Sequence, residues 1–345
     1  MKIIAIEKSE WDGGVLRAQK TYRTVGPVRE NGIGVFRQLE AGKLPDLAAA
    51  DTKLSPKSVV FPQTEVMFRY DLDEKSENHH RLQELAADKT PMAVVGIRPA
   101  DARAILLMKN NFNTDRYRDP FWMDRFERCT FVGLAVTDPA STDFSTSCGT
   151  GPFDTAGLDL LLVEEQERYL ALVVTDKGDG WLSCAGFTAA AGGDAAARIE
   201  ALKCASEQKI QSTVSFDRIR EKSELELFSA NFWEDVAFGC LNCGACTYAC
   251  PTCWCFDIQD ETFGTEGVRM RNWDSCMTRL FTLHGSGHNP REHDWQRTRQ
   301  RFMHKLKYFP DQYGEGVMCV GCGRCVEQCP AGIDIRKICE KMNAC

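Results

Sequence analysis

Two runs of closely spaced cysteines near the C-terminus carry the residues best suited to chemistry. The first run is Cys240, Cys243, Cys246 and Cys250, and the second is Cys319, Cys322, Cys325 and Cys329. Each reads C-x2-C-x2-C-x3-C-P, closed by Pro251 or Pro330. Thiolates in this spacing are typical ligands of [4Fe–4S] cubanes. The sequence therefore predicts two [4Fe–4S] clusters.

The same spacing predicts which cysteines share a cluster. Three cysteines at intervals of three can face one side of a cubane from a single tight loop, so the fourth ligand must come from elsewhere. In two-cluster ferredoxins, the cysteine before the proline ligates the other cluster. Cluster A is therefore predicted to be held by Cys240, Cys243, Cys246 and Cys329. Cluster B is predicted to be held by Cys319, Cys322, Cys325 and Cys250.

Glycines and prolines fit these loops. Gly244, Gly321 and Gly323 stand next to ligand cysteines, where a positive φ and close backbone approach would aim N–H groups at sulfur. Pro251 and Pro330 are expected to end the short helical turns that carry the fourth cysteines. The alternative is a zinc-stabilised interaction module, but structural zinc prefers two separated C-x2–4-C pairs. Iron–sulfur protein is brown and zinc protein is colourless, so colour distinguishes the two.

Composition limits the class of protein. The chain has 345 residues, 17 cysteines and a formal net charge of −7. An acidic chain is not expected to bind nucleic acid, and its sequence has no apolar run of membrane-spanning length. The segment 1–10 has no basic-then-apolar signal pattern. We therefore expect a cytoplasmic protein whose cysteines stay reduced and serve as ligands.

The predicted fold class is α+β with two domains. Apolar runs predict strands at 2–7, 92–97, 130–136, 157–163 and 169–174, and helices are expected at 80–87, 100–109 and 194–208. Their alternation indicates an α/β scaffold and docking domain over residues 1–215. An amphipathic connecting helix at 218–238 should lead into a mainly helical, ferredoxin-type dicluster domain over residues 216–345, with an insert between the cysteine runs.

Five C-terminal cysteines exceed the eight that two cubanes need. They are Cys253, Cys255, Cys276, Cys339 and Cys345. A free cysteine is often a small buried hydrophobe, so packing is the favoured role of the first three. The alternative function is a thiol-redox enzyme subunit in which Cys253, Cys255 or Cys276 performs disulfide chemistry beside a cluster. That chemistry requires an accessible thiolate of lowered pKa.

The insert also contains a basic stripe in an otherwise acidic chain. Its members are Arg297, Arg299, Arg301, Lys305 and Lys307. A charge run of this kind is usually a solvated helix face, and docking of an acidic partner is the less favoured alternative.

Several motifs together resemble one protein type. They are CLNCGACTYACPTCWCFDIQDE, WDSC, GHNPRE and CVGCGRCVEQCPAGIDI in the last 120 residues, and FPQTEVMFRY, GIRPADARA and GTGP in the N-terminal half. The chain resembles the iron–sulfur beta subunits of cytoplasmic sulfhydrogenases, which are similar to the iron–sulfur subunit of anaerobic sulfite reductase.

The resemblance implies an electron-transfer subunit of a hetero-oligomeric complex. It would relay electrons between an NAD(P)H-oxidising, FAD-containing flavoprotein and a catalytic or heterodisulfide-reductase-like bifurcating partner, with no catalytic residue of its own. Relatives tend to have cysteines in the GIRPAD motif and before GTGP, where they would hold another metal centre. The matching positions here are Ala100, Val136, Ala140, Asp143 and Ser145. Because an alanine offers no lone pair to a metal, the resemblance implies that this extra site is absent.

Overall fold

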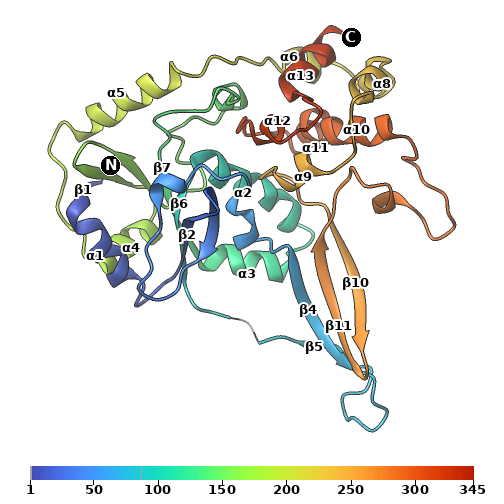
Figure 1. Ribbon diagram of the computed structural model, residues 1–345, viewed down its shortest axis with the longest axis horizontal. Coiled ribbons are helices and arrows are strands. Elements are labelled where there is room, and N and C mark those ends of the chain that lie inside the picture. The colour runs from blue at the N-terminus through green and yellow to red at the C-terminus, as the bar shows by residue number, and fades with distance from the viewer. Residues whose placement is uncertain (1, 87) are drawn as a thin grey trace.

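The computed structural model describes residues 2–86 and 88–345. A seven-stranded mixed sheet organises the N-terminal half, in the order β1-β9-β8-β7-β6-β2-β3 (Figure 1). The strands are β1 (Ile3–Glu7), β2 (Arg23–Glu30), β3 (Ile33–Gln38), β6 (Met92–Ile97), β7 (Cys129–Leu134), β8 (Leu160–Glu164) and β9 (Arg168–Val173). The pairs β2–β6, β6–β7 and β7–β8 are parallel, and the outer pairs are antiparallel. The strand predicted at 2–7 is present as β1 and lies at an edge of the sheet.

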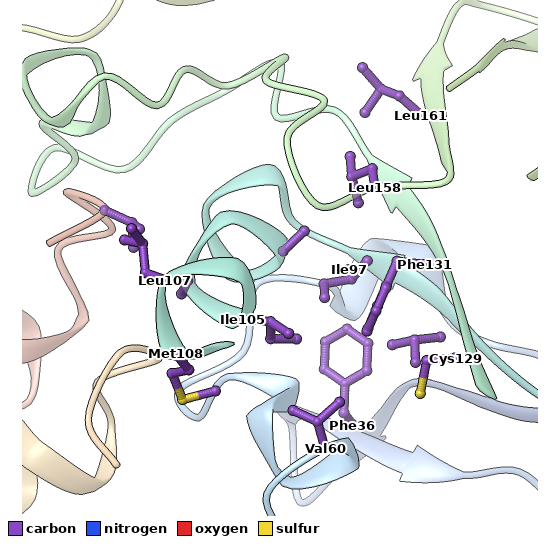
Figure 2. Packing of buried hydrophobic residues seen from close by; sticks show 14 of the residues in the cluster. Phe36, Val60, Ile97, Ile105, Leu107, Met108, Cys129, Phe131, Leu158 and Leu161 are labelled. Carbon is purple, nitrogen blue, oxygen red and sulfur yellow. The ribbon is translucent and has the colours of Figure 1, made fainter. Parts of the chain in front are cut away.

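Helices cover both faces of this sheet because alternate strand residues point to opposite sides. In β6, Ala93 and Val95 pack with α1 (Lys8–Ala18) and α4 (Asp176–Ala185). On the other face, Val94 and Ile97 pack with α2 (Pro99–Phe112), α3 (Pro120–Arg128) and α5 (Ala195–Glu207). Figure 2 shows this second core, where Ile97, Ile105 and Phe131 gather beneath α2. The predicted α/β arrangement of this half is therefore present.

A second sheet joins the N-terminal half to the insert. It runs β10-β11-β4-β5 and consists of β4 (Thr64–Asp71), β5 (Gln83–Glu84), β10 (Phe256–Phe263) and β11 (Glu266–Trp273). The β10–β11 hairpin projects from the body (Figure 1). The α+β class is confirmed, but the C-terminal segment holds this hairpin as well as helices. The boundary near residue 215 stays a prediction, since β4 pairs with β11 across it.

Short helices make up the rest of the C-terminal segment. They are α6 (Asp217–Glu221), α7 (Glu224–Phe228), α8 (Phe232–Ala237), α9 (Ala245–Tyr248), α10 (Asp294–Met303), α11 (Phe309–Tyr313), α12 (Arg324–Glu327) and α13 (Ile335–Ala344). A π-helical turn, η5 (His304–Tyr308), links α10 to α11. Four 3-10 turns, η1 (Leu47–Ala49), η2 (Pro56–Val59), η3 (Ser145–Cys148) and η4 (Leu280–Thr282), lie in loops. Trp233, Phe302 and Ile338 are among the buried residues of this segment's own core.

Two predicted helices are wrong. Residues 80–86 contain only the short strand β5, and Leu82 and Leu85 are largely exposed, so no apolar face is buried to stabilise a helix; residue 87 lies outside the described residues. The expected connecting helix at 218–238 is divided into α6, α7 and α8. Ser223 causes one break, because its side chain accepts a hydrogen bond from the Glu226 N–H and starts α7.

Buried ion pairs tie the two halves together. The Arg324 guanidinium donates to both carboxylate oxygens of Asp101, at 2.6 and 2.8 Å, and to the Thr52 carbonyl at 2.8 Å. Arg271 in β11 donates to Glu65 in β4 at 2.6 Å. A bidentate Arg–carboxylate pair fixes orientation as well as distance. The loop that carries the second cysteine run is therefore anchored on α2.

Among the described residues, the structure has no helix that is both long and apolar enough to cross a membrane.

Candidate metal centre

Four cysteines from both runs line one cavity, here called cavity A. They are Cys240, Cys243, Cys246 and Cys329, the set predicted for cluster A. The cavity has a volume of about 30 Å³, and Met277, Phe302 and Ile333 supply apolar walls. Cys243 is exposed, whereas the other three are partly buried. Cavity A therefore lies close to the protein surface.

The remaining four predicted ligands line a second cavity, here called cavity B. They are Cys250, Cys319, Cys322 and Cys325. Its volume is about 20 Å³, and Phe144 and Ile335 lie in its wall. Each cavity thus takes three cysteines from one run and the cysteine before the proline from the other. The structure brings together the two predicted ligand sets, although assignment of the ligands themselves stays a prediction.

The backbone explains how the chain achieves this exchange. Gly244, Gly321 and Gly323 have φ values of 75°, 66° and 75°, a left-handed conformation that glycine adopts without steric cost. A Cβ on Gly323 would come within 2.2 Å of the Thr142 hydroxyl oxygen, so close packing also requires glycine there. Each run then enters a single helical turn, α9 or α12, and these two turns lie side by side (Figure 1).

Backbone N–H groups point at two of the ligand sulfurs. The Asn242 N–H donates to the Cys240 sulfur at 3.4 Å, and the Ile333 N–H donates to the Cys329 sulfur at 3.2 Å. Donors of this kind stabilise negative charge on sulfur and are one means by which a protein sets a cluster's potential. The predicted N–H···S hydrogen bonds are thus present at cavity A.

The basic stripe is buried, so the prediction of a solvated face is wrong. Its five cations are at most 8% exposed: Arg297, Arg299, Arg301, Lys305 and Lys307. Arg301 lines both cavities, and its Nε has no hydrogen-bond partner within the part of the chain that the structure describes. A buried cation is costly unless negative charge lies nearby. Arg301 therefore marks the region between the cavities as one built for anionic groups.

Lys305 and Lys57 add positive charge beside cavity B. Lys305 lines the cavity and donates to the Thr252 hydroxyl at 2.7 Å. Lys57 donates to the carbonyls of Cys250 and Cys253, each at 2.9 Å. Burial lowers the pKa of Lys305, but negative charge on the nearby sulfurs, that of Cys250 first, raises it above the ordinary lysine value. It therefore stays protonated beside the cavity.

The π-helical turn η5 positions Lys305. Pro310 has no N–H, so it cannot donate to the Lys305 carbonyl as the residue five positions on would in a π-helix. That carbonyl instead accepts from the Met318 N–H at 2.9 Å. Because Met318 precedes Cys319, this bond joins the cationic helix directly to the second cysteine run.

The thiols themselves fit a metal cluster. Burial raises the pKa of Cys325 to about 11 and moves the pKa of Cys322 higher still. Such thiols stay neutral at pH 7 unless a metal replaces the proton. Four thiols around one cavity, beside the buried cations Arg301 and Lys305, make a donor set that suits a [4Fe–4S] cluster. Among the described residues, no three His, Cys, Asp or Glu side chains are close enough together to bind one single metal ion.

The positions at which the resemblance implies a lost metal site also meet in space. Ala100, Val136, Ala140, Asp143 and Ser145 all line one cavity of about 20 Å³. Cys322 lies in the same wall, so this cavity adjoins cavity B. The resemblance thus grouped residues that are far apart in the sequence and close in the structure.

The spare cysteines fall into two groups. Cys339 of α13 is fully buried in the core of the C-terminal segment, and Cys345 is exposed. Cys253, Cys255 and Cys276 instead cluster beside Cys250. Packing explains the burial of Cys339. The clustering of Cys253, Cys255 and Cys276 needs a further explanation.

Comparison with known proteins agrees with this geometry. Residues 239–333 match the family model described as a 4Fe-4S dicluster domain. The chain is also similar to sulfhydrogenase 2 subunit beta of Pyrococcus furiosus, with 28% identity over 340 residues that cover 94% of each chain. No solved structure matches. The predicted resemblance to iron–sulfur beta subunits is therefore confirmed, as are 4Fe–4S chemistry and a role in electron transfer.

Proposed function

We propose that this protein is a subunit that relays electrons through two [4Fe–4S] clusters, one in cavity A and one in cavity B. The observation that carries the proposal is the pair of four-cysteine cavities that share Arg301 as a common wall. Each cluster would exchange one electron at a time. Because Arg301 lines both cavities, the two clusters would lie near each other, as a relay requires.

The proposed ligands follow the cavities. Cys240, Cys243, Cys246 and Cys329 would hold cluster A. Cys319, Cys322, Cys325 and Cys250 would hold cluster B. Around them, the chain excludes water with apolar walls, donates N–H groups to sulfur and places Arg301 and Lys305 where negative charge must be neutralised. These residues bind and tune the clusters and take no direct part in bond-making chemistry.

The proposed partners come from the relative and from the surface near cavity A. The similar protein is named as the beta subunit of a sulfhydrogenase, which supports a hetero-oligomeric complex. We propose that an NAD(P)H-oxidising flavoprotein and a catalytic or heterodisulfide-reductase-like protein occupy the two ends of the relay. Phe238 and Leu241 flank Cys240 and are 95% and 68% exposed. Apolar side chains so exposed beside an exposed ligand cysteine suit the docking site of the flavoprotein.

The metal content tests the relay. Protein purified without oxygen should contain about eight irons and about eight sulfides per chain. After reduction, EPR should show two magnetically interacting cubane signals, and a flavoprotein should elute in the same fraction. About four irons would leave one cavity without a cluster, and about twelve would require a third site; either result contradicts the proposal.

Docking at Phe238 is tested separately. Phe238→Ser should weaken retention of the flavoprotein by about tenfold or more, since burying a phenylalanine contributes roughly 1.5–3 kcal/mol. Phe263→Ser is the matched control, because Phe263 is 91% exposed at the end of β10 and far along the hairpin from the cysteines. Iron content should stay unchanged in both variants. Equal retention of flavin by the two variants would place the flavoprotein elsewhere.

A further inference from the structure

A large cavity lies beside the cluster sites and is lined by two cysteines that the proposed function does not use. Its volume is about 710 Å³, far larger than cavity A or cavity B. Cys255 and Cys276 both lie in its wall. Phe112, Trp254 and Phe256 give it an aromatic side, and Arg291 also lines it. These dimensions suit a small organic molecule.

The fold holds the two cysteines against each other. Phe256 pairs with Trp273 at the base of the β10–β11 hairpin, and the Asp274 N–H donates to the Cys255 carbonyl at 2.9 Å. Two residues further along the chain, the Cys276 thiol and N–H lie beside the Cys255 sulfur, where they stabilise its thiolate. Both cysteines are free thiols. The two thiols are therefore neighbours in the wall of the cavity, as a dithiol–disulfide pair requires.

The pair also lies next to cavity B. The Cys253 thiol hydrogen-bonds to that of Cys250, and it is close enough to Cys276 to affect its charge. The positively charged Lys305 side chain lies near the sulfurs of both Cys250 and Cys255. Cys253, Cys276 and Cys255 thus lie one beside the next, between the proposed ligand Cys250 and the large cavity. Packing alone gives no reason for such an arrangement at a cavity wall.

We propose that Cys255 and Cys276 form a dithiol–disulfide site that reduces a small organic disulfide bound in this cavity. The inference rests on the proposed function, because the electrons come from the two reduced clusters. The substrate class is a disulfide that carries a carboxylate, since Arg291 can pair with an anion and the aromatic wall can hold the organic body.

The reaction balances as two exchange steps and one reduction. The Cys255 thiolate attacks one sulfur of the bound disulfide, forming a mixed disulfide and releasing the first thiol after it takes up a proton. Cys276 then attacks the Cys255 sulfur, which releases the second thiol and leaves a Cys255–Cys276 disulfide. Two electrons, one from each reduced cluster, and two protons restore the pair. The sum is one disulfide, two electrons and two protons converted to two thiols.

Cys255 and Cys276 differ in exposure and in pKa, as the attacking and the resolving cysteine should. Cys255 is partly exposed and Cys276 is buried, so Cys255 is the one that a substrate can reach. Hydrogen bonds from the Cys276 thiol, opposed by burial, lower the pKa of Cys255 to about 7. A thiol with a pKa near the ambient pH is the most effective attacking group. Cys276 remains protonated until it is needed to resolve the mixed disulfide.

Trapping with oxidised glutathione tests the proposal. All proteins carry Cys184→Ser, Cys204→Ser and Cys345→Ser, which remove exposed thiols outside the cavity and outside the proposed ligand sets. In this background, Cys276→Ser should accumulate one mixed disulfide at Cys255, located by peptide mass mapping, and should release only one equivalent of glutathione. Cys255→Ser should accumulate none in the cavity. The unaltered pair should form a Cys255–Cys276 disulfide that disappears when the clusters are reduced.

The controls separate this proposal from the relay. Iron content and the EPR signals should be unchanged in both variants, and loss of iron from either would overturn the proposal by making that cysteine a ligand. Absence of a mixed disulfide in Cys276→Ser, with both clusters present, would overturn it while leaving the relay intact. Cystamine, a cationic disulfide, should react at least tenfold more slowly than glutathione disulfide; equal rates would refute the assignment of an anionic substrate.

Discussion

Replacing Cys250 with alanine should remove the cluster from cavity B, although Cys250 belongs to the first cysteine run. Cavity B is lined by Cys319, Cys322 and Cys325 from the second run and by Cys250 alone from the first. A cubane that loses one of four thiolates is left with an open iron site and is degraded readily. Iron should fall from about eight to about four per chain.

The reciprocal variant identifies which cluster is lost. Cys329→Ala should remove the cluster from cavity A, which contains Cys240, Cys243 and Cys246. The EPR signal that remains in Cys250→Ala should match the one that remains in Cys319→Ala. The signal that remains in Cys329→Ala should match that of Cys240→Ala. If the signal that remains in Cys250→Ala instead matched that of Cys240→Ala, each cluster would take all four ligands from one run, and the proposed exchange of ligands would be wrong.

Cys253→Ala is the matched control for this experiment. Cys253 lies three positions after Cys250 and hydrogen-bonds to it, but it lines neither cavity A nor cavity B. Its replacement should leave about eight irons per chain. Iron loss in this variant equal to that in Cys250→Ala would assign Cys253 a ligand role and would refute the proposed ligand set.

Local sequence signals predicted the features that depend on neighbouring residues. The spacing of the cysteines in each run is that of one tight loop. It therefore predicted which cysteines line the same cavity. The run Met92–Ile97 is apolar throughout because both faces of a central parallel strand are covered, and its bounds agree with β6. The glycines beside the cysteines predicted positive φ because few other residues adopt it at low cost.

Features that depend on distant partners were missed. The stripe from Arg297 to Lys307 has the charge of a solvated helix, but partners distant in sequence explain its burial: Arg301 and Lys305 line the cavities, and Arg299 packs on Phe228. One signal was available: Phe302, Met303 and Leu306 lie among the charges and give this helix an apolar side suited to burial. The pairing of β11 with β4 joins segments almost 200 residues apart, a contact that no local pattern encodes.

The Cys255–Cys276 pair belongs to this second group. Cysteines 21 positions apart give no spacing signal, and the sequence alone favoured simple packing. They meet because the β10–β11 hairpin folds back on itself and returns Cys276 to the start of β10. The sequence shows that the two residues are cysteines, but their proximity follows from the register of the hairpin.

Arg301→Gln should lower the reduction potentials of both clusters by roughly 100 mV. The cause is electrostatic: reduction adds negative charge to a cluster, and a nearby cation stabilises that charge and raises the potential. At a separation of roughly 6 Å and an effective dielectric constant of about 20, one charge contributes about 3 kcal/mol. For a one-electron couple this corresponds to ~120 mV. EPR-monitored redox titration measures both clusters in one sample.

Two further variants separate charge from packing. Arg301→Lys keeps the charge and should retain most of the potential, whereas Lys305→Met should lower mainly the potential of cluster B, because Lys305 lines cavity B and not cavity A. Arg299→Gln is the matched control: Arg299 is also buried, but it stacks 3.3 Å from the Phe228 ring centre and lines neither cavity. If Arg301→Gln and Arg299→Gln shifted the potentials equally, the effect would come from repacking of α10. If Arg301→Gln alone lowers both, a single buried cation holds the two clusters at potentials near enough for electrons to pass between them.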